Sequence, residues 1–521
     1  MDTHSIIEFL LLLLIVASLI AFITFRFKLP YTVALVFGGI LIDLFHLPIV
    51  EHIRESDDRL LTPDIIFMVF LPGLLFEAGM NLHVRHLMRD LTPILLLAIP
   101  GVIIATLVTG FAVHWALGLP LIAALVFGVL IAATDPISVL ALFKELGAPK
   151  RLNVLVEGES LFNDGTAVVL FQILLAGAVS GEFDVVQGIG RFLVVALGGG
   201  ALGLGLGYLV SRATERIDDP RVEITLTTIL AYGSFLLAEQ LHVSGVIATV
   251  GAAVMIGNFG AEKGMSSRTR VALWSFWEYW AFVINSLVFL MIGIEVHVFD
   301  LLGHWQAIAL AIGVVLLGRI VTVYTITPLS NIFSKPISFV WQHVLVWGGI
   351  HGSVSLALVL TLPLDFPYRG QILAMTFGVV AFSIVLQGLT VAPLMRRLGI
   401  DLGKEDDYDK IKVRRMAIMA ELQELDRMRR ADSVSPATYQ KLRTELDAKL
   451  EQVHARMDAL HTELPERADQ ELQEARVHLI HAEKAAVQRA LSEGLVSLHT
   501  AEEMLARADD ELDGLSRQKH E

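Results

Sequence analysis

Apolar runs of about 20 residues, separated by short charged or Pro- and Gly-containing breaks, recur from the N-terminus to about residue 400. An α-helix needs about this length to cross roughly 30 Å of hydrocarbon. Only 48 of the first 400 residues are charged, against 46 of the remaining 121. A domain so poor in charge would expose too much apolar surface to water. We therefore expect residues 1–400 to form an all-α membrane domain and residues 401–521 to lie outside the lipid.

The breaks divide the first 400 residues into thirteen expected spans, at 5–25, 29–48, 61–80, 92–117, 120–143, 152–178, 185–211, 222–241, 243–260, 272–294, 304–329, 338–362 and 370–395. If successive loops alternate sides, fourteen Lys and Arg residues fall on one side and three or four on the other. This bias predicts an outside N-terminus and a cytoplasmic C-terminus. Because the start lacks a basic segment, the first run reads as a span and not as a cleaved signal peptide.

Composition excludes several classes of function. The chain has no cysteine, which removes disulfides, thiolate metal sites and cysteine nucleophiles. Its formal net charge is −14 and it has no dense basic tract, so nucleic acid is not an expected partner. We see no spacing typical of a hydrolytic triad or of a metalloenzyme, and we do not expect an enzyme.

The charged tail, residues 401–521, reads as helices from Met416 onward. Breaks fall at Ser433-Val434-Ser435-Pro436 and at Leu464-Pro465. Between them one apolar stripe recurs at spacings of three and four, formed by Leu442, Leu446, Leu450, Val453, Met457 and Leu460. Two interpretations stay open: a solvent-facing helical appendage, or a regulatory domain that contacts a regulator or a partner protomer.

Charged side chains inside the expected spans are few. Arg319 is the one basic residue deep within a span, whereas the acids placed most clearly at depth are Glu77, Asp135, Glu159 and Asp164. A charge in lipid is costly and usually functional. The surplus of carboxylates is typical of a pathway for a small cation.

The sixth span, 152–178, carries two neighbouring polar faces. Ser160 and Asp164 are four residues apart, and so are Glu159 and Asn163, so each pair shares a face of a helix. Oxygen ligands suit a hard cation, so we assign Asp164 and Ser160 to ion binding. Glu159 is the expected partner of Arg319, because a buried guanidinium needs a carboxylate. The alternative is a purely structural polar network.

The fifth span, 120–143, contains Thr134-Asp135-Pro136. Proline interrupts a helix, so a break is expected near Thr134. Carbonyls released at membrane depth are tolerated where an ion, water or protein satisfies them, which makes the Thr134 carbonyl a candidate ligand. Asp135 would compensate the positive end of a half-helix. A simple proline kink is the alternative.

Glycines mark two further features. Trp347-Gly348-Gly349-Ile350-His351-Gly352 predicts a second interruption, in the twelfth span. His351 there is more typical of a hydrogen-bonded packing residue than of a ligand. The run 199–207 contains a GxGxxG match, but it lies inside an apolar span and predicts close helix packing, not nucleotide binding.

Three strings together resemble the sodium/proton exchangers of the NhaP and NHE type, in the cation/proton antiporter superfamily: Thr134-Asp135-Pro136, the segment 157–165 (EGESLFNDG), and Trp347-Gly348-Gly349. The resemblance covers residues 5–397. It implies a thirteen-helix inverted-repeat fold in which the interrupted fifth and twelfth helices cross beside the ion site. It also implies a homodimer with a dimerisation domain and a mobile core domain.

The resemblance also implies roles for single residues. Asp164 matches the ion-binding and proton-carrying aspartate, and Ser160, the Thr134 carbonyl and Glu77 match further ligands. Asp135 and Asn163 match supporting positions, and Glu159 with Arg319 matches a structural ion pair. An asparagine directly before the aspartate is typical of the electroneutral branch. One departure is His351, which stands where many relatives have arginine.

The expected function is therefore exchange of Na⁺, or of Li⁺, for H⁺ by alternating access, without a cofactor. The expected location is the plasma membrane, in a bacterium the inner membrane, with a role in Na⁺ and pH homeostasis. Alternatives that stay open are K⁺/H⁺ exchange, a cation channel using the same carboxylates, and a membrane receptor or scaffold working through the tail.

Overall fold

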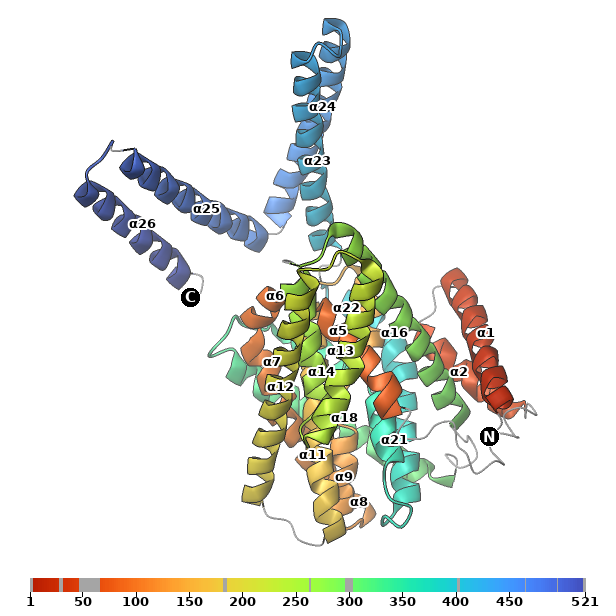
Figure 1. The fold of residues 1–521 in the computed structure, drawn as a ribbon. Coiled ribbons are helices and arrows are strands. Elements are labelled where there is room, and N and C mark those ends of the chain that lie inside the picture. The colour runs from red at the N-terminus through yellow and green to blue at the C-terminus, as the bar shows by residue number, and fades with distance from the viewer. Residues whose placement is uncertain are drawn as a thin grey trace. The chain divides into compact units, whose positions relative to one another are not determined.

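The computed structural model describes residues 3–27, 31–45, 66–180, 185–261, 264–295, 303–400, 403–463, 465–493 and 495–518. Across these ranges the regular structure is helical and no strand occurs (Figure 1). The chain divides into two compact units, Met1–Glu145 with Lys150–Ile400, and Leu146–Pro149 with Asp401–Glu521. The division falls where the charge density of the sequence changes, except that the short turn 146–149 groups with the tail. In that turn the Gly147 carbonyl accepts a hydrogen bond of 2.7 Å from the Gly403 amide.

Apart from α6 (Val84–Arg89), which lies in an expected loop, the helical segments of the first unit coincide with the described parts of the expected spans; residues 28–30 and 46–65 lie outside the described residues. These segments are α1 (Thr3–Phe27), α2 (Tyr31–Leu44), η1 (Ile66–Phe70), α5 (Leu71–Asn81), α6 (Val84–Arg89), α7 (Leu91–Ala98), α8 (Pro100–Leu117), α9 (Leu121–Leu130), α10 (Ile137–Leu146), α11 (Lys150–Ser180), α12 (Val185–Thr214), α13 (Pro220–Gln240), α14 (Gly245–Met255), η2 (Ile256–Gly260), α16 (Ser267–Glu295), α18 (Trp305–Ser330), α19 (Phe339–Trp347), α20 (Ser353–Leu360), α21 (Arg369–Phe382), η3 (Ser383–Gln387) and α22 (Gly388–Arg397). Among the described residues, 7 helices are long and apolar enough to cross a membrane.

Two of the expected spans are interrupted, at the places that proline and glycine predict. In the fifth span α9 ends at Leu130 and α10 begins at Ile137, directly after Pro136. In the twelfth span α19 ends at Trp347 and α20 begins at Ser353, after the glycine-containing segment. Each interruption leaves about five residues of irregular backbone between two half-helices, and that backbone must find its hydrogen bonds elsewhere.

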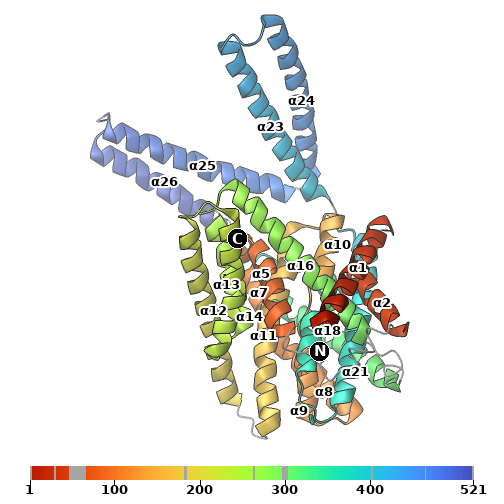
Figure 2. The same ribbon diagram turned by 45° about the vertical axis from the view of Figure 1, so that its right-hand side comes forward.

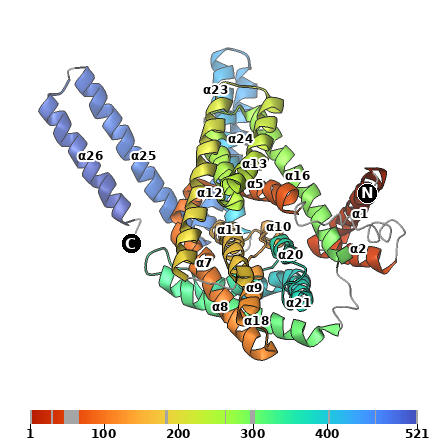
Figure 3. The same ribbon diagram turned by 60° about the horizontal axis from the view of Figure 1, so that its bottom comes forward.

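Close helix packing positions the interrupted helices. α11 contacts α7, α9, α12 and α14, while α8 packs between α9 and α18 (Figures 2 and 3). The glycine run in α12 faces α14: a Cβ built on Gly203 would lie 2.7 Å from the Ala248 carbonyl carbon, and one on Gly199 would lie 2.6 Å from the Ser244 oxygen. The prediction of close packing at 199–207 is therefore confirmed.

The second unit consists of two helical hairpins. One pairs α23 (Lys404–Arg430) with α24 (Pro436–Glu463), and the other pairs α25 (Pro465–Ser492) with α26 (Leu498–Gln518) (Figure 1). The predicted apolar stripe on α24 is buried toward its end, at Val453, Met457 and Leu460, whereas Leu442 near its start is exposed. Tyr408 of α23 packs with Met457 and Leu460.

Candidate cation site at the crossing of two interrupted helices

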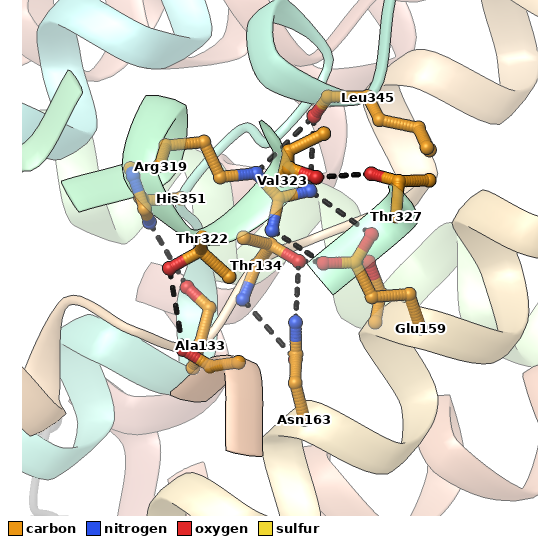
Figure 4. Close-up of polar contacts among 12 residues, drawn as sticks. Ala133, Thr134, Glu159, Asn163, Arg319, Thr322, Val323, Thr327, Leu345 and His351 are labelled. Atoms are coloured by element: carbon orange, nitrogen blue, oxygen red, sulfur yellow. Dashed lines mark hydrogen bonds and ion pairs between the residues drawn. The ribbon is translucent and has the colours of Figure 1, made fainter. Parts of the chain in front are cut away.

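The two irregular segments hydrogen-bond to one another. The Asp135 amide, in the fifth-span break, donates to the Ile350 carbonyl in the twelfth-span break at 2.6 Å. In the other direction, the Ala133 carbonyl accepts from His351 Nδ1 at 3.0 Å and from Ser355 Oγ at 3.4 Å (Figure 4). These bonds satisfy backbone groups that the breaks leave without helical partners, and they hold the two segments together.

The carboxylate of Asp135 lies against the start of α20. A Cβ built on Gly352, the residue before α20, would lie 2.8 Å from Asp135 Cγ. A carboxylate at this place compensates the positive end of the half-helix α20. Gly352 is required here because any larger residue would displace the carboxylate.

Helix α11 supplies the next layer of polar groups. Asn163 Nδ2 donates to Thr134 Oγ1 at 2.8 Å, and the Thr134 amide donates to Asn163 Oδ1 at 3.3 Å (Figure 4). Ser160 Oγ and Thr134 Oγ1 are 2.9 Å apart and share a hydrogen bond. All three residues are buried. The Thr134 side of the break is therefore tied to α11 through both its backbone and its hydroxyl.

Asp164 lies one helical turn beyond Ser160 and is 7% exposed. Its Oδ1 atom is buried and has no hydrogen-bond partner among the described residues. It lies close enough to Asp135 for the two negative charges to repel. A buried carboxylate oxygen left without a donor is costly, and a bound proton or a small cation would remove that cost.

Within the part of the chain that the structure describes, the Thr134 carbonyl is a second acceptor without a hydrogen bond. No hydrogen bond within the described part of the chain reaches it, although its neighbour Ala133 accepts two. With Ser160 Oγ and the Asp164 carboxylate, it gives oxygen acceptors on two neighbouring elements, α11 and the fifth-span break. Oxygen ligands of this kind suit a hard cation.

The expected ion pair lies beside this set. Arg319 of α18 contacts Glu159 with both terminal nitrogens, Nη1 binding Oε1 and Nη2 donating to Oε2 at 2.9 Å (Figure 4). Its Nε and Nη2 also donate to the Leu345 carbonyl, near the end of α19, at 3.2 and 2.9 Å. The guanidinium lies against Gly349, where a Cβ would be 2.6 Å from Nε. Arg319 therefore links α18, α11 and the second break.

The sodium/hydrogen exchanger transmembrane family matches residues 11–397 of this sequence. The chain belongs to this family. It is 38% identical to the Na⁺/H⁺ antiporter NhaG of Bacillus atrophaeus, over 98% of each chain. It is 40% identical to the Na⁺/H⁺ antiporter NhaP of Pseudomonas aeruginosa, over 73% of this chain and 94% of that one.

The fold is similar to that of a solved member. The structure of the sodium proton antiporter MjNhaP1 from Methanocaldococcus jannaschii at pH 8 matches with a TM-score of 0.64 and 21% identity, over 76% of this chain and 99% of that one. The exchanger family consists of transporters, so this chain is a multi-pass membrane protein and not an enzyme.

One expected ligand of the exchanger lies apart from the described network at the crossing. Glu77 of α5 accepts from Asn81 Nδ2 at 2.6 Å, and Asn81 Oδ1 accepts from Trp274 Nε1 at 3.0 Å. Its charged neighbours are Glu278, Lys144 and Glu157. Glu157 was not predicted as a site residue, although it precedes Ser160 and Asp164 by three and seven residues and so shares their face of α11.

A cavity of about 20 Å³ lies behind the crossing, with room for about one water molecule. Its polar lining includes Thr134, Asn163, Arg319, Thr322 and His351. Asp164 does not line it. The cavity therefore lies among the hydrogen-bonded groups that support the crossing.

Proposed function

We propose that this protein exchanges Na⁺ for H⁺ across a membrane and that the Asp164 carboxylate carries both ions in turn. The observation that carries the assignment is the Asp164 Oδ1 atom beside the crossing of two interrupted helices, buried and without a hydrogen-bond partner among the described residues, in a member of the sodium/hydrogen exchanger family. Relatives that match most of the chain are named Na⁺/H⁺ antiporters, and this favours Na⁺ over the K⁺ alternative.

Na⁺ and H⁺ compete for the Asp164 carboxylate, and this competition couples the transport of one ion to that of the other. A proton bound to Asp164 neutralises the carboxylate, and Na⁺ binds it only when the proton has left. If the site can change sides only when an ion is bound to it, each turnover carries Na⁺ in one direction and H⁺ in the other. An inward proton gradient then expels Na⁺, and this supports Na⁺ and pH homeostasis.

The proposed Na⁺ ligands are Asp164, Ser160 Oγ, the Thr134 carbonyl and Glu77. The first three come from α11 and the fifth-span break, where Asn163 holds Thr134 in place. Glu77 is the fourth, although here its carboxylate accepts from Asn81. We propose no cofactor, because the transported ions are the substrates.

The architecture that we propose for this exchanger has thirteen spans arranged as inverted repeats, an outside N-terminus and a cytoplasmic tail. Its support is the asymmetry of basic residues between alternate loops. We further propose a homodimer in the plasma membrane, in a bacterium the inner membrane. The tail hairpins are proposed to contact a regulator or the partner protomer, and truncation after Arg397 is expected to leave exchange partly active.

Reconstituted exchange tests the assignment. Purified protein is placed in liposomes with an internal pH indicator, a proton gradient is imposed, and Na⁺, Li⁺ or K⁺ is added. Na⁺ is expected to drive proton movement in the wild type, unchanged when the membrane potential is clamped, because one charge crosses in each direction. A current without proton counterflow would identify a channel instead.

Asp164→Asn is the decisive variant of this assay. It keeps the shape of the side chain and removes the exchangeable charge, so exchange is expected to fall to the level of empty liposomes while the protein still folds. Asp365→Asn is the matched control, since Asp365 is exposed in the loop before α21 and its change should leave exchange intact. Exchange retained by Asp164→Asn would refute the assignment.

A further inference from the structure

His351 occupies the centre of the crossing, and its hydrogen bonds define which of its ring nitrogens carries a proton. The side chain is buried, at 5% exposure. Its Nδ1 lies 3.0 Å from the Ala133 carbonyl oxygen. A carbonyl oxygen can only accept, so Nδ1 must carry the hydrogen.

The charged groups around His351 favour a neutral ring. Arg319 of α18 lines the same cavity as His351, and Glu159 of α11, which also lines it, is already bound to Arg319. Asp135 lies on the other side, with its carboxylate against Gly352 at the start of α20. A second buried cation beside Arg319 would lack a carboxylate of its own, so the neutral form with Nδ1–H is favoured.

We propose that His351 is a positioning residue that decides which backbone carbonyl of the fifth-span break faces the transported cation. Its Nδ1–H, together with the Ser355 hydroxyl, holds the Ala133 carbonyl toward α20. The next carbonyl along the chain, that of Thr134, receives no hydrogen bond within the described residues. His351 thereby keeps one carbonyl away from the ion and leaves the other available to it.

The backbone of His351 reinforces this geometry. Its amide donates to Ser383 Oγ at 3.1 Å, and Ser383 Oγ in turn lies 3.3 Å from the His351 carbonyl. The residue is therefore held in place by η3 while its ring holds the opposite break. A change at Nδ1 alters the break that carries Thr134 without removing any proposed ligand of the ion.

Two substitutions distinguish the roles of the two ring nitrogens of His351. Asparagine places an N–H donor near the position of Nδ1, whereas glutamine places one near the position of Nε2. In the liposome assay His351→Asn is expected to keep the KM for Na⁺ within about threefold of the wild type and to leave the pH profile unchanged. His351→Gln is expected to raise that KM about tenfold or more, because the Ala133 carbonyl loses its donor.

Other outcomes overturn the proposal. Wild-type behaviour of both variants would make His351 a packing residue. If His351→Gln stays active while a folded His351→Asn loses activity, Nε2 and not Nδ1 is the atom that positions the break. A shifted pH profile in His351→Asn would show that the ring is a titrating group. Ser355→Ala removes the weaker donor to the same carbonyl and is expected to raise the KM by a smaller factor; no rise would contradict the shared role.

A measurement on the unmutated protein does not depend on transport. In ¹⁵N-histidine-labelled protein, the His351 signal is identified by its loss in His351→Asn or, should that variant not fold, in His351→Gln. We expect the neutral Nδ1–H form from pH 6 to 9; an Nε2–H or charged ring would overturn the proposal. The kinetic arm rests on the proposed function, but the ring's protonation does not, so failure of exchange and failure of this inference can be told apart.

Discussion

Arg319 and Glu159 form a buried ion pair across α18 and α11, with side chains only 12% and 2% exposed. Both terminal nitrogens of the guanidinium face the carboxylate, and Arg319 also binds the Leu345 carbonyl. Three helical segments thus depend on one arginine. The pair therefore joins α18 and α11 to α19, beside the second interruption.

Removing Arg319 alone should therefore damage folding. Arg319→Met leaves Glu159 as a buried unpaired charge, and we expect a loss of about 3–5 kcal/mol in the free energy of unfolding. The melting temperature of the purified protein in detergent measures it. Combining the change with Glu159→Gln should restore part of the loss, but not all, because the Leu345 carbonyl still lacks its donors. Additive losses would contradict the pairing. Arg191→Met, at an exposed position of α12, is the control.

Asn163→Asp should impair ion binding and also weaken the fold around the first break. The asparagine amide both donates to Thr134 Oγ1 and accepts from the Thr134 amide. Aspartate keeps the acceptor, loses the donor and adds a second negative charge beside Asp164. We expect a several-fold rise in the KM for Na⁺ in reconstituted exchange, together with a lower melting temperature, because a charge is added at a buried position and a hydrogen bond is lost. An unchanged KM would show that the Thr134 contact does not shape the site.

Gly203→Leu should destabilise the membrane unit. A side chain at this position meets the backbone of Ala248 in α14, so α12 and α14 must separate. We expect a loss of about 1–3 kcal/mol in stability, seen as a lower melting temperature and a lower yield. Gly205→Leu is the matched control on the same helix, because a Cβ there meets nothing within 4 Å. Equal losses in the two variants would argue against the contact between α12 and α14 as the cause, since leucine is a better helix former than glycine at both positions.

The tail should loosen at acid pH where its two hairpins meet. The Tyr408 hydroxyl donates to Glu471 and, with His461 and Arg415 nearby, holds the pKa of that carboxyl below its ordinary value despite partial burial. A depressed carboxyl pKa stabilises the fold above the pKa of the unfolded chain, about 4.3, and this stability is lost as the pH falls through the folded value.

Hydrogen–deuterium exchange of α25 in the full-length protein measures this loss after correction for intrinsic rates. Exchange should quicken between about pH 5 and 3. Tyr408→Phe removes the donor, so the acid-induced loss should be smaller and should be complete at higher pH, with about 1–2 kcal/mol less protection at neutral pH. Tyr439→Phe removes a similar donor to Asp426 within the first hairpin and should leave α25 unaffected. Unchanged exchange in Tyr408→Phe would contradict the expected link.

Local chemistry made several features predictable from the sequence. Proline cannot continue a helix, so the break before α10 was readable from Pro136. Glycines weakened the helix between α19 and α20 in the same way. A lone arginine in lipid requires a carboxylate, and this identified Glu159 as its partner before any contact was known. Apolar length and loop charge gave the positions of the helical segments.

Other features were decided by the tertiary structure alone. Some contacts join residues that are far apart in the chain: those of Asn163 and Ser160 with Thr134, and that of His351 with Ala133. The placement of Glu77 beside Asn81 depends on side-chain rotation. Periodicity gives the face on which a residue lies, but not the angle and depth at which two helices cross. Those crossings determine which carbonyls are occupied and which remain free, and so they decide where a cation can bind.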